Sequence, residues 1–227
     1  EIRDIMLLKV GHRGARAYEV ENTIESFGKA VELGANAVEL DVRQSKDREL
    51  IISHDDNLKK VFGKEISVSE STLAELKEVT GKRIITLKEC LHFLSGKVEK
   101  ILVELKEVGY EKKVLDVIRK EKLEDRVIIV SFHEEALASV RELNKKIETG
   151  LIYAQFRKPL DAALRLKAQY LVALYRFVHS GDVDRAHKNG LKVIVWTINT
   201  KEEAKKYTAK GVDGIASDRP DILQGLG

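Results

Sequence analysis

Strand-like apolar segments alternate with helix-like segments along the chain. A strand followed by a helix and then by another strand places the two strands parallel, and eight such units close into a barrel. The chain is therefore predicted to be an α/β protein, a closed (β/α)8 barrel. The expected strands are 7–11, 37–42, 101–105, 127–130, 149–152, 170–174, 192–197 and 214–216, and the expected helices are 23–33, 87–94, 112–120, 134–143, 159–167, 182–188 and 202–210.

One irregularity interrupts this alternation after the second expected strand. The apolar segment 50–53 follows directly, and residues 57–85 form a short insertion before the next helix. The tail 221–227 is short for an eighth helix, so that element is expected to be abbreviated or frayed. With 227 residues, 43% of them hydrophobic, the chain fits one domain spanning 1–227 at the lower end of barrel sizes.

Acidic side chains occupy alternate positions on two of the expected strands. Side chains on a strand alternate between its faces, so Glu39 and Asp41 project to one side and Leu40 to the other. The same alternation places Glu104 and Lys106 on one face of segment 101–106. Burying three carboxylates together is costly unless a cation neutralises them, and hard oxygen ligands suit Mg²⁺ or Ca²⁺ better than zinc. The pattern predicts one divalent metal ion, with Mn²⁺ as a third candidate.

Two histidines end expected strands. His12 follows the apolar segment 6–10, and His54 follows 50–53, so each imidazole is expected at the C-terminal tip of a strand. Imidazole has an unperturbed pKa of roughly 6.5, which lets it act as a general acid or base near neutrality. Two such groups can divide the proton transfers of a hydrolysis between them.

Cationic side chains accompany these groups. Arg13 supplies a planar fork matched to phosphate oxygens, and Lys106 a compact second charge. Glu21 is expected to hold Arg13 by a bidentate pair, while Asn22 or Thr23 opens the helix that follows. Together, these residue types predict a site that binds and cleaves a phosphodiester.

The motifs HRG, ENT, ExD and HD occur in this order within the first quarter of the chain. With the segments around them, the chain closely resembles the glycerophosphodiester phosphodiesterase family over nearly its whole length. Any one triplet is a weak signal, but the set in this order and spacing is highly specific. The matching segments are HRGARAYEVENTIESFGKAVELGANAVELDV, DRELIISHDDNL, ILVELK, VIIVSF, VIVWTIN and IASDRP.

The resemblance implies a TIM barrel that hydrolyses glycerophosphodiesters to glycerol 3-phosphate and an alcohol. It implies His12 and His54 as the acid/base pair, and Trp196 as a side chain facing the glycerol or its leaving group. Departures such as Val20, where the family usually has Pro, touch no reactive group. The family often has a longer insertion after HD, so a more open mouth is expected here. The implied metal ligands are Glu39, Asp41 and Glu104.

Active sites of such barrels lie at the C-terminal ends of the strands, which nominates further residues. Glu21, Asn22, Asp55 and Ser131 are expected to support the site. His133 is expected to cap a helix or lie at the rim rather than to take part in catalysis. The residues expected to form the wall are Ser131, Phe132, His133, Tyr153, Tyr175, Arg176, Trp196, Asn199, Ser217 and Asp218.

Two other functions remain open. A lysophospholipase D would use the same polar site and need an apolar channel for an acyl chain. A phosphate-binding barrel without catalysis would usually have lost a ligand or proton donor, and none is missing here. Attack by the substrate's own glycerol 2-hydroxyl or by water also stays open. The scattered aromatics that could line a channel are Phe62, Phe132, Phe156 and Phe177.

Composition excludes some partners. The net charge is only +3 on 40 basic and 37 acidic side chains, which favours an ion-paired surface over nucleic-acid binding. A small glycerophosphodiester is the expected partner, and the oligomeric state stays open.

The single cysteine, Cys90, is expected in the buried core on a helix. No segment is apolar enough to span a membrane and no signal peptide is recognisable, so a cytoplasmic location is expected. Abundant Lys and Glu with one Cys and one Met suit a heat-stable protein.

Overall fold

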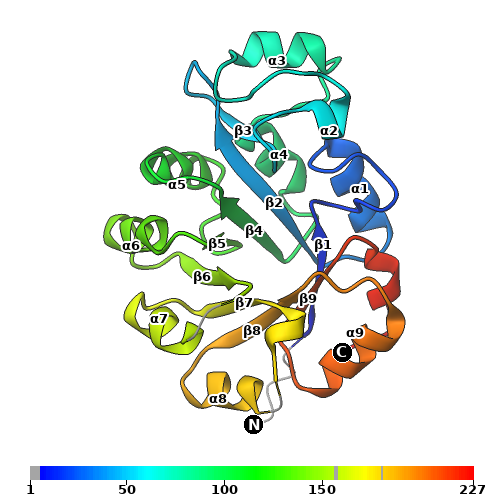
Figure 1. Ribbon diagram of the computed structural model, residues 1–227, viewed down its shortest axis with the longest axis vertical. Coiled ribbons are helices and arrows are strands. Elements are labelled where there is room, and N and C mark those ends of the chain that lie inside the picture. Colours follow the sequence, from blue (N-terminus) through cyan, green and yellow to red (C-terminus); the bar gives the residue numbers. More distant parts are fainter. Residues whose placement is uncertain (1–5, 156–157, 180) are drawn as a thin grey trace.

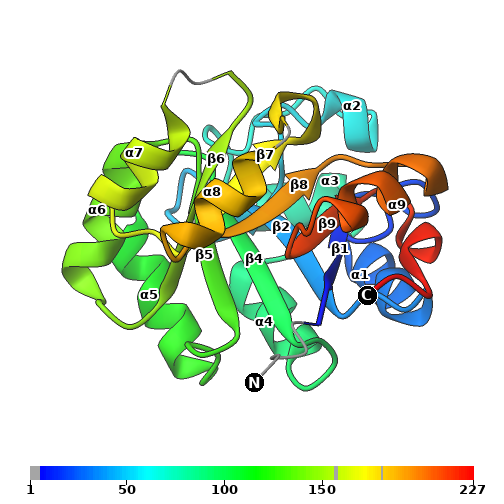
Figure 2. The same cartoon turned by 90° about the horizontal axis from the view of Figure 1, so that it is seen from below.

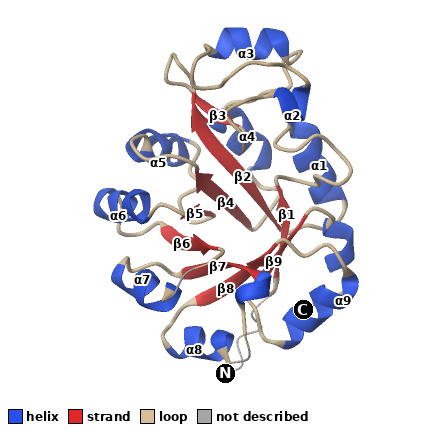
Figure 3. Ribbon diagram, in the orientation of Figure 1, coloured by secondary structure: helices blue, strands red, loops and turns tan. Residues whose placement is uncertain are grey.

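The apolar segments of the chain form the strands of a closed parallel barrel, surrounded by helices, in the computed structural model (Figure 1). The structure describes residues 6–155, 158–179 and 181–227. Figure 3 shows the strands as an inner ring and most helices as an outer one. Within the described residues the barrel strands are β1 (Leu8–His12), β2 (Ala37–Gln44), β4 (Lys100–Leu105), β5 (Val127–Ser131), β6 (Glu148–Tyr153), β7 (Tyr170–Leu174), β8 (Lys192–Trp196) and β9 (Gly214–Ser217).

Strand pairing closes the ring. The order β1-β9-β8-β7-β6-β5-β4-β2 is parallel throughout, and β1 pairs with β2 as well as with β9. The first and last strands of the chain are therefore neighbours, and the TIM-barrel prediction is confirmed. The additional strand β3 (Leu50–Ile52) is antiparallel to β2 and extends the sheet beyond the ring.

Helices follow the barrel strands and cover the outside of the ring (Figure 2). An abbreviated or frayed last helix was expected in the tail 221–227, and the 3-10 turn η2 (Pro220–Leu223) lies at its start. Within the described residues, no helix has both the length and the apolar character that crossing a membrane requires. The helices around the ring are α1 (Ile24–Glu32), α4 (Leu87–Leu94), α5 (Glu111–Lys120), α6 (Glu134–Leu143), α7 (Pro159–Arg165), α8 (Asp182–Lys188) and α9 (Lys201–Ala209), with the 3-10 turn η1 (Tyr175–Phe177) before α8.

Strand alternation sorts the apolar side chains into two layers. Residues such as Leu40 and Val103 face outward and pack with the helices, in a cluster that also holds the buried thiol of Cys90. Side chains at the intervening positions fill the barrel interior. This inner cluster consists of Val10, Ala37, Leu102, Ile128, Val130, Ile152, Tyr170, Val172, Ile194 and Ala216.

The insertion between β3 and α4 has its own small core. It contains α2 (Lys59–Phe62) and α3 (Leu73–Val79), which lie beside the barrel near β3 in Figure 1. Neither helix was predicted from the sequence, because both are short and carry few buried side chains. Their apolar cluster consists of Ile51, Leu58, Val68, Leu76 and Ile84.

The start of α4 is set by a capping box. The Thr86 hydroxyl accepts from the Glu89 backbone N–H at 3.2 Å, and Glu89 Oε2 accepts from the Thr86 N–H at 2.8 Å. We expect Thr86→Ala to lower the free energy of unfolding by about 1 kcal/mol, and the melting temperature by roughly 2–4 °C. Thermal unfolding measures this, with Thr86→Ser as the control that keeps the hydroxyl. A Thr86→Ala protein with an unchanged melting temperature would contradict the expected contribution of the cap.

Candidate active site

Strand register brings the three predicted carboxylates together. Asp41 on β2 lies opposite Glu104 on β4, and Glu39 lies two residues before Asp41 on the same face. One carboxylate oxygen from each of these side chains lies within 4.8 Å of the others, and all three residues are buried. The alternation expected from the sequence therefore produces a compact acidic triad inside the barrel.

The electrostatics of this triad fit a divalent cation. Burial, together with the neighbouring charge of Asp41, raises the pKa of Glu104 to about 7 and that of Glu39 well above its usual value. Burial also opposes ionisation of Asp41, but the charges of Lys106, Arg13 and His54 lower its pKa. Among the described residues, Glu39 Oε1 and Asp41 Oδ1 are buried and accept no hydrogen bond. Buried carboxylate oxygens that accept no hydrogen bond, in a crowded anionic cluster, are suitable ligands for a hard cation.

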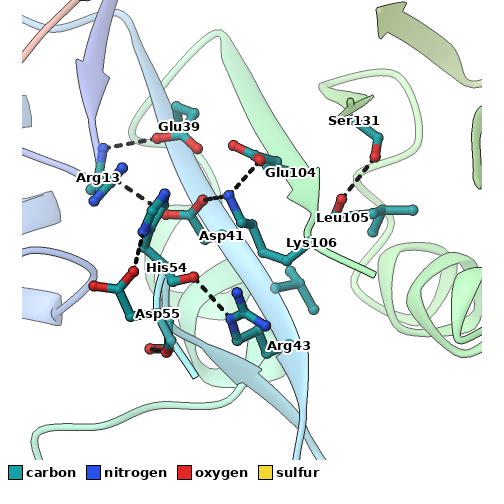
Figure 4. A network of polar contacts seen from close by, with 12 residues as sticks. Arg13, Glu39, Asp41, Arg43, His54, Asp55, Glu104, Leu105, Lys106 and Ser131 are labelled. Atoms are coloured by element: carbon teal, nitrogen blue, oxygen red, sulfur yellow. Dashed lines mark hydrogen bonds and ion pairs between the residues drawn. The ribbon is translucent and has the colours of Figure 1, made fainter. Parts of the chain in front are cut away.

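Arg13 and Lys106 flank the triad (Figure 4). The backbone N–H of Arg13 donates to Glu39 Oε2 at 3.0 Å, and its guanidinium Nε lies 3.4 Å from Asp41 Oδ2. Lys106 Nζ donates to Glu104 Oε1 at 2.7 Å and lies 3.6 Å from Asp41 Oδ1. Burial opposes both charges, but the carboxylates raise the pKa of each side chain. Both cations therefore stay charged beside the acidic triad.

The turn after β1 orients Arg13, although not as expected. Arg13 Nη1 donates to Glu21 Oε1 at 2.9 Å, while Arg16 Nε lies 2.7 Å from Glu21 Oε2. The predicted bidentate pair is thus wrong, because the two oxygens of Glu21 serve two different arginines. Thr23 caps α1, whereas Asn22, at a positive φ of 59°, donates from Nδ2 to Asp41 Oδ2 at 2.9 Å.

His12 and His54 reach the site from different elements. His12 ends β1 opposite Glu39 on β2, and its Nε2 lies 3.9 Å from Glu39 Oε2. The hairpin of β2 and β3 returns the chain toward the triad, where the N–H of Ser53 donates to the carbonyl of Asp41 at 3.0 Å. His54 follows directly, and the carboxylate of Asp55 lies 2.8 Å from its Nδ1. Both imidazoles therefore lie beside the acidic triad.

Burial and two neighbouring cations lower the pKa of the second imidazole, that of His54. Burial is the largest influence and lowers the pKa of His54, as do the charges of Lys106 and Arg13, whereas Asp41 opposes them. Arg43 Nε donates to the His54 carbonyl at 2.8 Å and so holds the backbone at this position.

These groups share one cavity of about 150 Å³. Its polar side is lined by His12, Arg13, Glu39, His54, Glu104 and Lys106. The rest of the cavity lining is apolar, and part of it belongs to the cluster of side chains inside the barrel. This part, here called the cavity floor, consists of Leu102, Val130, Ile152, Val172 and Ala216.

An aromatic pair completes the apolar side. Phe132 and Trp196, here called the aromatic edge, line the cavity with ring centroids 5.9 Å apart and planes at 89°. The indole Nε1 of Trp196 donates to the Val172 carbonyl at 3.1 Å, which fixes the ring. Trp196 is therefore placed where it can contact a bound ligand.

Several residues expected in the wall lie elsewhere. Ser131 is buried and does not line the cavity; its hydroxyl donates to the Leu105 carbonyl at 2.8 Å, so it supports the backbone before Lys106 (Figure 4). His133 lies at the rim, with Nε2 3.0 Å from the Lys106 carbonyl. The wall prediction fails for Ser131, whose hydroxyl turns to the backbone. His133 was expected at a helix cap or at the rim, and it is the N-cap residue of α6, although its side chain makes no capping hydrogen bond. The wall prediction also fails for Tyr153, Tyr175, Arg176, Asn199, Ser217 and Asp218, none of which lines the cavity among the described residues.

The proposed acyl channel is not assembled from the expected aromatics. Phe132 lines the site, but Phe62 packs on the small core of the insertion. Phe177 and Tyr153 line a separate cavity of about 410 Å³ between α7 and α8. Phe156 lies outside the described residues.

Asp218 contacts a catalytic candidate, which its expected place in the wall did not predict. Its Oδ1 lies 2.7 Å from Nδ1 of His12, and Asn199 Nδ2 donates to its Oδ2 at 2.9 Å. Burial opposes its ionisation, but the hydrogen bond from His12 lowers the pKa of Asp218. The available signal was its position directly after β9, which pairs with β1 when the barrel closes.

Comparison with known proteins agrees with this geometry. Residues 12–222 match the glycerophosphoryl diester phosphodiesterase family. A glycerophosphodiester phosphodiesterase of Caldanaerobacter subterraneus subsp. tengcongensis is 34% identical over 235 residues, covering 96% of this chain and 97% of that protein.

Solved structures give the same result. The crystal structure of a glycerophosphodiester phosphodiesterase from Thermotoga maritima is 31% identical, with a TM-score of 0.84 and coverage of 96% and 97% of the two chains. An Oleispira antarctica phosphodiesterase, solved in complex with the product sn-glycerol-3-phosphate, is 27% identical, with a TM-score of 0.84 and coverage of 95% and 94%. This chain therefore belongs to the glycerophosphoryl diester phosphodiesterase family.

Proposed function

We propose that this protein hydrolyses glycerophosphodiesters to glycerol 3-phosphate and an alcohol with the help of one divalent cation. The observation that carries the proposal is the composition of the 150 Å³ cavity, which two carboxylates of the acidic triad, two cations and two imidazoles line. The third carboxylate, Asp41, has an oxygen within 4.8 Å of the other two. Each of these groups has a use in phosphodiester cleavage. The family supports the same reaction.

Glu39, Asp41 and Glu104 would hold the cation, and Mg²⁺, Ca²⁺ and Mn²⁺ all suit an all-carboxylate site. When bound, such an ion polarises a phosphate oxygen and lowers the pKa of an attacking hydroxyl. The triad's own contribution is a pre-formed set of buried oxygens, held by Arg13, Asn22 and Lys106.

Arg13 and Lys106 would bind the non-bridging oxygens of the phosphate. Both side chains line the cavity, and both are held on the side of the triad by carboxylates. Their positive charge attracts a phosphodiester monoanion and stabilises the negative charge that builds up on the phosphate oxygens in the transition state. Because the carboxylates fix both cations beforehand, little reorganisation is needed when the substrate binds.

His12 and His54 would move the protons. One imidazole removes the proton from the attacking hydroxyl as its oxygen bonds to phosphorus, and the other protonates the alcohol oxygen as its bond to phosphorus breaks. Asp218 and Asp55 each contact the Nδ1 of one histidine, so Nε2 is the nitrogen available to the substrate in both. The hydroxyl can belong to water or to the glycerol 2-position, which would form a cyclic phosphate that water then opens.

The apolar side of the cavity would accept the carbon skeleton of the substrate. The cavity floor offers no hydrogen-bonding side chain, and the aromatic edge borders it. The whole cavity has a volume of about 150 Å³, which suits a small glycerophosphate group better than an acyl chain. The free glycerophosphodiester is therefore the proposed substrate, rather than a lysophospholipid.

The test is turnover by metal-stripped protein supplied with Mg²⁺, Ca²⁺ or Mn²⁺. Glycerophosphocholine, glycerophosphoethanolamine, glycerophosphoglycerol and a lysophospholipid are offered separately, and glycerol 3-phosphate and lysophosphatidate are measured. We expect glycerol 3-phosphate from the glycerophosphodiesters only when a divalent ion is present. Phosphorus NMR during the reaction shows whether a cyclic phosphate forms.

Each other result names a different function. Lysophosphatidate without glycerol 3-phosphate would make the protein a lysophospholipase D. No product with any of the three ions, from protein that still binds glycerol 3-phosphate, would make it a phosphate-binding barrel. Turnover unaffected by metal removal would overturn the role given to the acidic triad.

A further inference from the structure

We propose that Asp218 and Asn199 are positioning residues that hold His12 in the tautomer with the proton on Nδ1, so that Nε2 faces the cavity as the proton-exchanging nitrogen. The inference rests on the proposed function in one respect, that His12 exchanges a proton with the substrate. It adds two residues that do not line the cavity and act through the imidazole.

The first step is the contact of Asp218 with His12. Asp218 Oδ1 lies 2.7 Å from Nδ1, a length typical of a charge-assisted hydrogen bond. An ionised carboxylate can only accept hydrogen bonds, so the imidazole must donate from Nδ1. The other ring nitrogen, Nε2, then carries a lone pair when the ring is neutral and points toward Glu39 and the cavity.

The second step is the fixed orientation of the Asn199 amide. Its oxygen Oδ1 accepts from the backbone N–H of Asp218 at 2.9 Å and from the Ser217 hydroxyl at 3.1 Å. A backbone N–H is always a donor, so the amide cannot be turned around without losing this bond. Its nitrogen Nδ2 must therefore face Asp218 Oδ2, at 2.9 Å.

Because of these two contacts, replacing one carboxylate oxygen of Asp218 by nitrogen should change the tautomer of His12. In Asp218→Asn, the new side-chain oxygen has to face the Asn199 NH₂ group, since two donors cannot bond each other. The new NH₂ group then takes the position of Oδ1, next to His12 Nδ1. Nδ1 has to accept this hydrogen bond, which moves the imidazole proton to Nε2. The nitrogen facing the cavity would lose its lone pair with almost no change in shape.

The partner of His54 is held differently. Asp55 Oδ1 lies 2.8 Å from His54 Nδ1, but the Asp55 side chain is about one-third exposed. Among the described residues, His54 is its side-chain hydrogen-bond partner, and no amide fixes the second oxygen. The amide that Asp55→Asn introduces could turn its oxygen toward Nδ1, so this change should preserve the tautomer of His54. The same Asp→Asn change is thus expected to invert the tautomer at His12 and to leave it unchanged at His54.

The direct test is the ring tautomer in ¹⁵N-histidine-labelled, Mg²⁺-loaded protein, observed by NMR when the imidazoles are neutral. His12 is assigned by the signal that disappears in His12→Ala. We expect an Nδ1–H ring for His12 in the wild type and an Nε2–H ring in Asp218→Asn. With this inversion, kcat should fall roughly 10²-fold or more while KM changes little, because Asp218 does not touch the substrate.

A second variant separates the tautomer from the charge of Asp218. In the double variant Asn199→Asp with Asp218→Asn, the new carboxylate at 199 can accept from the new NH₂ group at 218. The amide oxygen at 218 then faces His12 Nδ1, and the Nδ1–H tautomer returns. We expect kcat to recover at least tenfold over Asp218→Asn. Every hydrogen bond of the pair is satisfied in this variant, so it also carries the test if Asp218→Asn fails to fold.

Other results would overturn the inference. An Nε2–H ring in the wild type, an unchanged ring in folded Asp218→Asn, or no recovery in a folded double variant would each do so. Asp221→Asn is the surface control, because Asp221 accepts from the Tyr18 hydroxyl and does not contact His12. Normal turnover of His12→Ala would instead refute the proposed role of His12, while the tautomer measurement would still report on Asp218.

Discussion

Replacing His12 or His54 by alanine is expected to lower turnover by roughly 10²-fold or more while the barrel remains folded. Both imidazoles line the cavity beside the acidic triad, and neither belongs to an apolar cluster. Each change therefore removes a proton carrier without opening a void in the core. Steady-state kinetics with glycerophosphocholine measure the loss, and thermal unfolding verifies the fold.

A surface histidine provides the control for these variants. His92 on α4 has a side chain that is 83% exposed and lies 3.4 Å from a carboxylate oxygen of Glu121, which follows α5. His92→Ala should keep full turnover. Near-normal turnover of folded His12→Ala or His54→Ala would remove that residue from the mechanism.

The same two variants can assign the roles. A glycerophosphodiester whose alcohol is p-nitrophenol has a leaving group that needs no proton. The variant that lacks the general acid should recover most of its rate on this substrate, whereas the variant that lacks the general base should not. Equal losses on both substrates in both variants would contradict a division of labour between the imidazoles.

Changing Glu39 to Gln is expected to abolish the stabilisation of the protein by a divalent cation. Glu39 Oε2 accepts from the Arg13 N–H, and the amide oxygen of Gln can keep that bond, so the metal-free fold should persist. A ligand that binds only the folded state stabilises it by about 2.7 kcal/mol at a hundred times its Kd. We expect the wild type, but not Glu39→Gln, to melt at a higher temperature as Mg²⁺ or Ca²⁺ is added. Turnover should fall roughly 10²- to 10³-fold, because several kcal/mol of charge stabilisation is lost.

The control for this change is an acid outside the triad. Glu49 precedes β3, and its side chain is 45% exposed and lies 3.8 Å from Lys113. Glu49→Gln should show the same metal-dependent shift in melting temperature as the wild type. An equal shift in folded Glu39→Gln would show that Glu39 is not a ligand.

Local patterns in the sequence predicted which acidic side chains on the strands lie together in the site. Glu39 and Asp41 share a face because strands alternate, and Asp41 meets Glu104 because neighbouring parallel strands align their ends. His54 was also predicted at the end of the apolar segment 50–53, but the antiparallel pairing of β3 with β2 that returns it to the triad was not. These features depend on residues that are close in sequence or on adjacent strands.

Contacts that depend on closure and on exact side-chain geometry could not be predicted. His12 and Asp218 are 206 positions apart, and they meet only because β1 pairs with β9. The division of Glu21 between Arg13 and Arg16 depends on the path of the turn after β1. The inward or outward rotation of Ser131 at the end of β5 is likewise set by packing and by the Leu105 carbonyl.

The cavity floor belongs both to the proposed binding site and to the barrel interior. Truncating one such large side chain costs roughly 2–5 kcal/mol, a large share of the 5–15 kcal/mol by which a typical domain is stable. Substitutions in the cavity floor that would fit other substrates therefore carry a high cost in stability. Phe132 of the aromatic edge is 45% exposed and can change at smaller cost. A directed-evolution library for substrate range would accordingly vary Phe132 first, and not Trp196, which packs against the barrel interior.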